Sequence, residues 1–417
     1  MNYPVMYRIQ QRFDTTSIQD VAGAIRREFS RFDAGKKVRP GKRVAVTAGS
    51  RGIHHYVTIV ATVVECLRNM ELNPFIIPAM GSHGGATAEG QVKLLKGLGI
   101  TESSVGAPIV SNMDVISAGR LASGAEVFMS RDAFEADHLV LINRVKPHTA
   151  FRGEIESGLC KMLAVGCGKH EGALNMHKFG LATSIISATQ LLLKNAPALF
   201  GLAIVENALE QIHTIKLAPP EQFVEVDKEL LVRARNLLPR IPIEDLDILV
   251  VDEMGKNISG TGIDPNVTGF WRRDGGPREP DYRTLIVLDL TPETNGNALG
   301  IGMVDLTTRR VIDRVDLKAT YANVLTTGIW RSMRLPIALE NDRAVIEMAV
   351  SHVPDPRCIR MVRIVNTLQL ETFWATEALL PELRGQKGVI VDDTPLQLQF
   401  DNEGRLLSFM IHPKNRT

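Results

Sequence analysis

The stretch from Asp137 to His177, DHLVLINRVKPHTAFRGEIESGLCKMLAVGCGKHEGALNMH, joins a short apolar run to a polar segment that is rich in glycine. The run 139–142 predicts a buried β-strand, because it is short and made of branched apolar residues. At the carboxyl end of such a strand in an open α/β sheet, the backbone approaches ligands closely. The stretch therefore indicates a strand that leads directly into an active-site segment containing His148, Lys161 and His177.

Two similar strand-and-loop units precede this stretch. The run KRVAVTA, residues 42–48, is followed by a helical pattern over 56–70, and NPFIIPA, residues 73–79, is followed by another over 87–98. Each strand ends in a small-residue loop, and such a loop before a helix suits an anion such as phosphate. Repeated units of this kind predict a mostly parallel sheet covered on both faces. The two loops contain the residues Gly49, Ser50, Arg51, Gly52 and His83.

The second half of the chain predicts a separate domain. Residues 206–244 are polar and contain prolines, which is typical of a domain boundary. A new strand at 247–251 then leads into a glycine-rich loop that carries Lys256, and further strands are expected at 284–288 and 361–365, with helices at 319–334 and 343–350. We expect an α/β protein of two domains, each with a mostly parallel sheet flanked by helices, and an active site in the cleft between them. Their predicted extents are 1–240 for a cofactor-binding domain, 241–388 for a second α/β domain, and 389–417 for terminal strands that could pack back on the first.

Composition narrows the class of function. The chain has 417 residues, 44% apolar and 23% charged, which is typical of a globular protein too long for one core. Its net charge of +1 gives no electrostatic reason to expect nucleic acid or a membrane surface as partner. No apolar run reaches the roughly 18 residues of a membrane helix, and the N-terminus lacks the pattern of a secretory signal. We therefore expect a cytoplasmic protein that acts on a small molecule.

If the predicted strands are parallel, the loops that carry Arg51, His83, the His148 segment and Lys256 share one sheet edge. Imidazole has a pKa near neutrality, so two histidines on opposite sides of a carbon can exchange a proton in either direction, as a racemase requires. The arginine and Lys256 could hold a carboxylate. The set suits an anionic substrate from which a proton is removed.

The order and spacing of these residues resemble those of the lactate racemase family, whose members use a nickel-pincer nucleotide. Arg51 precedes His83, in Gly-Ser-His, by 32 residues, and Pro147-His148 precedes Lys161. His177, in Asn-Met-His, follows that lysine by 16 residues. The resemblance extends over most of the chain.

The resemblance implies a role for each residue. Lys161 would carry the nickel-pincer nucleotide (nickel pyridinium-3,5-bisthiocarboxylic acid mononucleotide) as a thioamide, and His177 would be the protein ligand to nickel. His83 and His148 would be the acid and base, Arg51 and Lys256 would contact the substrate or support the bases, and the turn Gly49, Ser50, Gly52 would lie near the nucleotide phosphate. The implied reaction inverts C2 of a 2-hydroxy acid by hydride transfer to and from the cofactor, with cofactor-synthesis proteins as partners.

The sequence also departs from the family pattern. The interval from His148 to Lys161 is 13 residues and holds Arg152, Glu154 and Glu156, and the arginine loop lacks the family's aspartate. Added polar groups favour a longer, hydroxyl-bearing acid over lactate, such as the aldonic acid gluconate. Two alternatives use the same residues. One is a zinc-dependent hydrolase with His83, His148 and His177 around an activated water, and the other is a non-catalytic sugar-acid binding protein.

Overall fold

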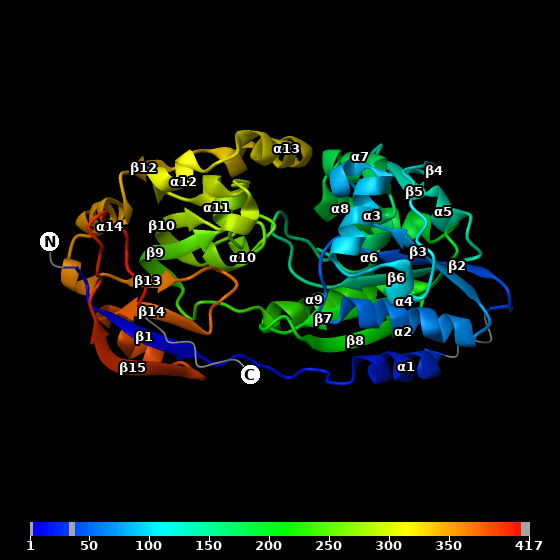
Figure 1. The fold of residues 1–417 in the computed structure, drawn as a ribbon, viewed down its shortest axis with the longest axis horizontal. Coiled ribbons are helices and arrows are strands. Elements are labelled where there is room, and N and C mark those ends of the chain that lie inside the picture. Colours follow the sequence, from blue (N-terminus) through cyan, green and yellow to red (C-terminus); the bar gives the residue numbers. More distant parts are fainter. Residues whose placement is uncertain (1–2, 33–37, 410–417) are drawn as a thin grey trace. The chain divides into compact units, whose positions relative to one another are not determined.

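The structure is a computed structural model that describes residues 3–32 and 38–409. Its contacts divide the chain into two compact units. The N-terminal unit is Asp14–Leu238, and the C-terminal unit combines Met1–Phe13 with Pro239–Thr417. Each unit is a sheet flanked by helices (Figure 1). The predicted α/β class with mostly parallel sheets is confirmed.

The N-terminal unit is built on a five-stranded sheet of order β3-β2-β6-β7-β8. The first four strands in this order are parallel, and the last is antiparallel to its neighbour. The strands are β2 Arg43–Ala48, β3 Asn73–Pro78, β6 His138–Arg144, β7 Ala198–Glu206 and β8 Ile212–Ala218. A separate hairpin joins β4 Val115–Arg120 to β5 Glu126–Ser130.

Both faces of this sheet are covered, as the continuous apolar strands predict. Val44 and Val46 belong to one core cluster and Ala45 to the other, because successive side chains point to opposite faces. One cluster includes residues of α1 Val21–Phe32 and α2 Tyr56–Asn69. The other includes residues of α6 Leu159–Lys161, α7 Lys169–Lys178, α8 Leu181–Leu192 and α9 Phe223–Leu237. The helices α3 Ala88–Gly97, α4 Glu102–Val105 and α5 Arg131–Phe134 also belong to this unit.

The C-terminal unit contains an eight-stranded sheet of order β12-β11-β10-β9-β13-β14-β1-β15. The first five strands are parallel and the last three are antiparallel to their neighbours. The strands are β9 Asp245–Met254, β10 Asp281–Leu290, β11 Leu306–Thr308, β12 Ile337–Leu339, β13 Met361–Ile364, β14 Thr372–Thr376, β1 Met6–Gln11 and β15 Val389–Leu396. The helices are α10 Pro265–Thr268, α11 Trp271–Asp274, α12 Arg309–Asp313, α13 Leu317–Thr327, α14 Asp342–Ser351 and α15 Leu380–Arg384.

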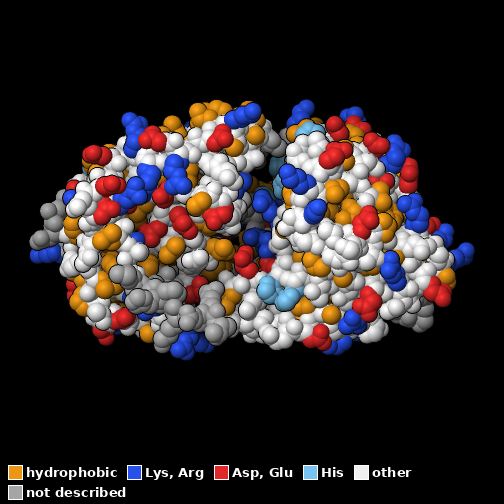
Figure 2. Space-filling model, in the orientation of Figure 1, with side chains coloured by type: hydrophobic (Ala, Val, Ile, Leu, Met, Phe, Trp, Pro, Cys, Tyr) orange, Lys and Arg blue, Asp and Glu red, His pale blue; other side chains and the backbone are white. Residues whose placement is uncertain are grey.

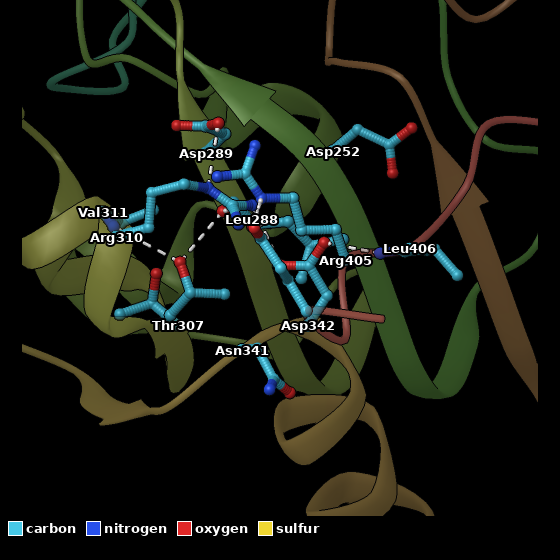
Figure 3. Close-up of polar contacts among 12 residues, drawn as sticks. Asp252, Leu288, Asp289, Thr307, Arg310, Val311, Asn341, Asp342, Arg405 and Leu406 are labelled. Atoms are coloured by element: carbon cyan, nitrogen blue, oxygen red, sulfur yellow. Dashed lines mark hydrogen bonds and ion pairs between the residues drawn. The ribbon is translucent and has the colours of Figure 1, made fainter. Parts of the chain in front are cut away.

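A network of ion pairs and hydrogen bonds ties Leu406, near the end of the described residues, to this sheet (Figure 3). Arg310 donates to Asp289 at the end of β10 and to Asp342 at the start of α14, at 3.1 and 2.9 Å. The other oxygen of Asp342 accepts the backbone N–H of Leu406 at 2.8 Å. The last part of the described chain is therefore held by the same carboxylate that pairs with Arg310.

The two ends of the chain differ from the division expected from sequence. The sequence places residues 1–13 in the first domain and lets 389–417 pack back on it. In the structure β1 pairs instead with both β14 and β15 of the C-terminal sheet. The physical reason is burial, because Met6 and Ile9 of β1 are fully covered by that unit's cores.

One face of the molecule can be followed in Figure 2, and neither sign of charge dominates there. Figure 2 shows acidic and basic side chains interspersed over the face in view, in keeping with the net charge of +1. None of the described helices combines the length and the apolar character needed to cross a bilayer.

Candidate functional site

The loops that follow β2, β3 and β6 emerge from the same edge of the N-terminal sheet, because these three strands are parallel neighbours. They carry Arg51, His83 and His148 respectively. Lys161 and His177 follow the third loop, on α6 and α7. Arg51, Lys161 and His177 lie close enough for their charges to interact, and His83 contacts Ser50 of the Arg51 loop. His148 and Lys161 both contact the Phe151 ring, so the structure gathers five of the predicted site residues in one unit.

Two glycines allow these loops to rest on the segment that bears Lys161. The Gly81 N–H donates to the Gly166 carbonyl at 3.2 Å, and a Cβ at Gly81 would lie 3.1 Å from the Cβ of Ala173. A Cβ at Gly49 would lie 3.3 Å from the terminal methyl of Met162. The backbone at these strand ends therefore lies close to residues 162–173 of the chain itself, because a glycine has no Cβ to prevent the contact.

Lys161 ends the three-residue helix α6 and is followed by a π-helical turn, Met162–Gly166. Such turns occur frequently at functional sites. Burial lowers the pKa of Lys161 to about 7, the nearby charge of Arg51 contributes to the lowering, and Glu156 acts in the opposite direction. The Nζ atom also lies 5.5 Å from the centroid of the Phe151 ring. A large fraction of this amine is therefore neutral and nucleophilic near pH 7.

His177 lies on α7, close enough to Lys161 to be affected by its charge. Burial lowers the pKa of this imidazole, and the positive charge of Lys161 adds to the effect. Both causes favour the neutral ring, which is the form that binds a metal. Among residues 3–32 and 38–409, no group of three or more His, Cys, Asp or Glu side chains is arranged to hold a metal ion.

A row of cations extends from this pair. Burial and the charge of Arg144 lower the pKa of Arg51, which in turn lowers that of Lys161. Arg144, at the end of β6, is paired with Glu206. Arg51 has no ion pair or hydrogen bond within the described chain. Cations that repel one another in a partly buried place favour binding of an anion there.

His83 is fixed on two sides. Its Nδ1 contacts the Ser50 hydroxyl, and its backbone carbonyl accepts from the Gln91 side chain at 3.3 Å. The same amide of Gln91, fully buried, donates to the Gly81 carbonyl at 2.9 Å. With Nδ1 engaged by Ser50, Nε2 is the ring nitrogen suited to proton transfer.

His148 is fixed through its own loop. Its backbone N–H donates to Glu156 at 2.7 Å, and its Nδ1 accepts the N–H of Ala150 at 3.0 Å. Its ring lies 4.5 Å from that of Phe151. A neutral imidazole that accepts at Nδ1 carries its proton on Nε2, so this geometry presents His148 as a proton donor.

The sequence predicts that the acidic residues between His148 and Lys161 are added polar groups of the site. In the structure they pair with other residues of the protein. Glu156 is fully buried and accepts from the N–H groups of His148 and Gly153 and from Arg235. Glu154 pairs with Lys228 and is largely exposed. The loop needs the Glu156 carboxylate to satisfy its own backbone, which explains why that carboxylate is not free for a substrate.

The predicted phosphate turn and Lys256 also have defined local contacts. The Gly49 N–H donates a hydrogen bond to the Tyr56 hydroxyl oxygen at 2.6 Å, and the Ser50 hydroxyl contacts Nδ1 of His83. A Cβ at Gly52 would lie 3.8 Å from the Leu98 side chain. Lys256 follows β9, which lies in the other sheet, so the four loops do not share one sheet edge. Its Nζ donates to the Gly260 carbonyl at 2.6 Å.

Sequence reasoning missed Asp227 on α9. Its two carboxylate oxygens accept the N–H groups of Leu159 and Cys160, at 2.9 and 2.8 Å, at the start of the helix that ends in Lys161. Burial raises the pKa of Asp227 to about 7. A signal was present, because Asp227 occupies a position on the apolar stripe of α9 between Phe223 and Leu231, where an acid needs a partner.

Comparisons with known proteins give a matching family model and a similar fold. Residues 13–184 match the family described as lactate racemase N-terminal domain. The chain is similar to the structure of the lactate racemase apoprotein from Thermoanaerobacterium thermosaccharolyticum, with 13% identity and a TM-score of 0.53 over 85% of this chain and 93% of that one. No curated protein matches the sequence. The N-terminal part of the chain, residues 13–184, thus matches the lactate racemase family, and the fold of the chain is similar to that of a lactate racemase.

Proposed function

We propose that this protein is a racemase or epimerase that inverts C2 of a 2-hydroxy acid, with a nickel-pincer nucleotide attached at Lys161. The main support for this proposal is the environment of Lys161. This lysine combines a pKa of about 7 with a position beside Arg51, so a neutral amine stands in an electropositive place. The cations would attract an anionic group that carries a thiocarboxylate, and the neutral amine could condense with it. Nζ would form the C–N bond of the thioamide, while the C–O bond of the thiocarboxylate breaks and its oxygen leaves as water.

The donor set fits this cofactor. The pincer group would bring its own sulfur and carbon ligands to nickel, so the protein would need to supply one further ligand, for which an imidazole is suitable. His177 is the neutral imidazole next to Lys161, with its pKa lowered by burial and by that lysine. When bound, the group supplies a ring that accepts the hydride of a 2-hydroxy acid and returns it.

The chain's own residues would handle the proton and the charge. One of His83 and His148 takes the proton of the substrate hydroxyl and the other serves the opposite isomer, as their separate loops allow. Arg51, without a partner in the described chain, would hold the substrate carboxylate through its two-pronged guanidinium. Lys256 is proposed as a further contact to the substrate or support for the bases, and the turn Gly49, Ser50, Gly52 as a neighbour of the cofactor phosphate.

For the substrate we propose a 2-hydroxy acid longer than lactate, with gluconate as the representative aldonic acid. Support comes from Arg152, which is exposed and donates to the His148 carbonyl at 3.1 Å. It thus places a donor-rich side chain beside one proposed acid or base. Lactate has no hydroxyl beyond C2 to use such a donor.

The test is to produce the protein together with the cofactor-synthesis proteins and to measure three quantities. Mass spectrometry of the Lys161 peptide should show the covalent nucleotide, metal analysis should give nickel, and incubation with single isomers of gluconate, malate and lactate should yield the opposite C2 epimer. Lys161→Ala should lose all three, whereas Lys178→Ala, a lysine of the same segment, should keep them.

Three results decide against the proposal. Protein that carries neither nickel nor the adduct under these conditions would exclude this cofactor. Saturable binding of a sugar acid without turnover, unaffected by Lys161→Ala, would favour the non-catalytic binding protein. Hydrolysis of an ester or amide restored by zinc would favour the hydrolase.

A further inference from the structure

Arg273 in the C-terminal unit is a buried cation that has no carboxylate partner among the residues that the structure describes. It lies on the short helix α11 and is 2% exposed. Its Nη1 donates to the Ser332 hydroxyl at 3.0 Å, whereas its Nε has no acceptor within the described chain. Burial lowers the pKa of Arg273 to about 10, and the negative charge of Asp274 raises it by a smaller amount. The guanidinium therefore remains charged at neutral pH. A buried charge with one neutral hydrogen bond is poorly compensated.

Other buried arginines of the same unit are compensated by the protein. Arg272, the preceding residue, pairs with Asp305 at 2.7 Å and donates to the carbonyl of Met303 at 2.9 Å. Arg363 makes a two-pronged pair with Asp252, at 2.8 and 3.0 Å. The side chains of Arg272 and Arg363 are each 3% exposed, which makes them matched in burial to Arg273. The missing counter-charge therefore distinguishes Arg273 from these two.

The surroundings of Arg273 are basic. Ser332 lies between Arg331 and Arg334, which are exposed and have no ion pair within residues 3–32 and 38–409. A Cβ at Gly275 would lie 3.9 Å from Nη1 of Arg331, so this segment approaches the turn that follows Arg273. Asp274 is the acid that acts on Arg273. Positive charges from two segments thus gather where Arg273 and Ser332 meet.

A guanidinium and a hydroxyl side by side are donors for an oxyanion. We propose that Arg273 and Ser332 form a binding site for an oxyanion, a phosphate or a carboxylate group, in the C-terminal unit. The anion supplies the counter-charge that the described part of the chain lacks, and Arg331 and Arg334 raise the local concentration of anions. This inference uses none of the residues assigned to the cofactor, and it holds or fails independently of the proposed racemase activity.

The experiment measures anion binding to full-length, cofactor-free protein. Arg51→Ala serves as the background, because the cations near Lys161 would also bind anions. Inorganic phosphate and malonate are titrated in separate arms by calorimetry and by thermal unfolding, with sodium chloride at matched ionic strength. We expect saturable binding in at least one arm, and the arm that responds identifies the phosphate or the carboxylate as ligand.

Substitutions locate the site. Arg273→Lys keeps the charge but loses the fork, so affinity should fall by about tenfold or more, and Ser332→Ala should weaken it by several-fold. Arg278→Met, an exposed arginine of the same segment, should leave it unchanged. Binding that survives Arg273→Lys and Ser332→Ala, or no saturable binding in the Arg51→Ala background, would overturn the proposal. Arg273→Met distinguishes a role of Arg273 in anion binding from a purely structural role. If Arg273 binds the anion, the rise in Tm that the anion causes should disappear in this variant, whatever the Tm of the variant without anion.

Discussion

At the scale of single residues, the site depends on repulsion between neighbouring cations. Burial is the larger cause of the lowered pKa of Lys161, and Arg51 is the next. Water screens an exposed pair of this kind, but a partly buried pair feels much of the charge. Arg51 therefore serves two purposes in the proposed function, since it attracts an anion and also keeps the lysine amine neutral.

This coupling can be tested by Arg51→Met. Removing the positive neighbour raises the pKa of Lys161 from about 7 toward its ordinary 10.5, although burial still holds it below that value. Labelling of Lys161 by an amine reagent should therefore rise with pH at a more alkaline midpoint in the variant. At a fixed pH below both midpoints, labelling should be slower in the variant, because a smaller fraction of the amine is neutral. Peptide mass spectrometry measures the rate.

Arg120→Met is the matched control, because Arg120 is an exposed arginine of the same unit that pairs with Glu126. Its labelling profile should equal that of the native chain. An unchanged midpoint in Arg51→Met would show that Arg51 does not act on the amine.

The contact between Ser50 and Nδ1 of His83 gives a second test at this scale. Loss of the hydroxyl in Ser50→Ala removes this partner of Nδ1, so the balance between the two neutral tautomers of the ring should change. Nitrogen chemical shifts of the imidazole measure this ratio without cofactor or substrate. Ser82→Ala, the neighbour on the other loop, should leave the ratio unchanged. Identical spectra for Ser50→Ala and the native chain would contradict the assignment.

At the scale of elements, the short helix α6 is stabilised by hydrogen bonds to a residue of another helix, α9. Leu159–Lys161 is too short to stabilise itself, and Asp227 of α9 accepts two of its N–H groups. Gly158 leaves room for that carboxylate, since its φ is +92° and a Cβ there would lie 2.2 Å from the Asp227 oxygen. The placement of Lys161 thus depends on a residue far along the chain.

Asp227→Ala should expose this dependence. Each backbone N–H left without an acceptor costs about 1–3 kcal/mol, so the free energy of unfolding should fall by at least that amount. Asp227→Asn keeps one oxygen and should lose less. Circular dichroism in urea measures the loss, and slower or altered labelling of Lys161 shows that the amine has moved. A neutral effect of Asp227→Ala on both would contradict the capping role.

The pH dependence has a definite sign. The pKa of folded Asp227 is about 7, above the ordinary 3.8, so between these values the folded chain binds more protons than the unfolded one. This group therefore favours folding at low pH, and its contribution is lost as pH rises through about 7. Asp227→Asn should remove that part of the pH dependence of unfolding, which urea titrations at a series of pH values measure.

The sequence predicted elements whose pattern is local and missed those set by distant contacts. Helix α2, expected at 56–70, spans Tyr56–Asn69 because its apolar stripe is unbroken. Helix α13, expected at 319–334, ends at Thr327, because Gly328 takes the left-handed conformation with φ +68°. The loops that carry Arg51, His83 and His148 could also be located from local sequence, because each follows directly on an apolar run that forms a strand. The cap by Asp227 and the use of Glu156 by the His148 loop depend on tertiary contacts that no local pattern contains.

At the scale of the whole molecule, the C-terminal unit is built from two segments that are far apart in the sequence. The first described strand, β1, pairs with β14 and β15, so the C-terminal unit needs both ends of the chain (Figure 1). A six-residue strand gives no sequence signal of its partners, which are selected by the shape of the remaining core. This explains why the sequence alone places residues 1–13 with the domain that follows them.

The contribution of β1 can be measured through Ile9, which is fully buried in the C-terminal core. Ile9→Ala should lower the free energy of unfolding by about 2–5 kcal/mol, since it removes buried methyl groups and leaves a cavity. The three tryptophans, Trp271, Trp330 and Trp374, all lie in this unit, so their fluorescence reports its unfolding in urea. Gln10→Ala changes the exposed neighbour on the same strand and should leave the midpoint unchanged. An unshifted tryptophan transition in Ile9→Ala would mean that the C-terminal unit does not depend on β1, whereas a large shift would show that the first strand of the chain stabilises a sheet encoded mostly at its other end.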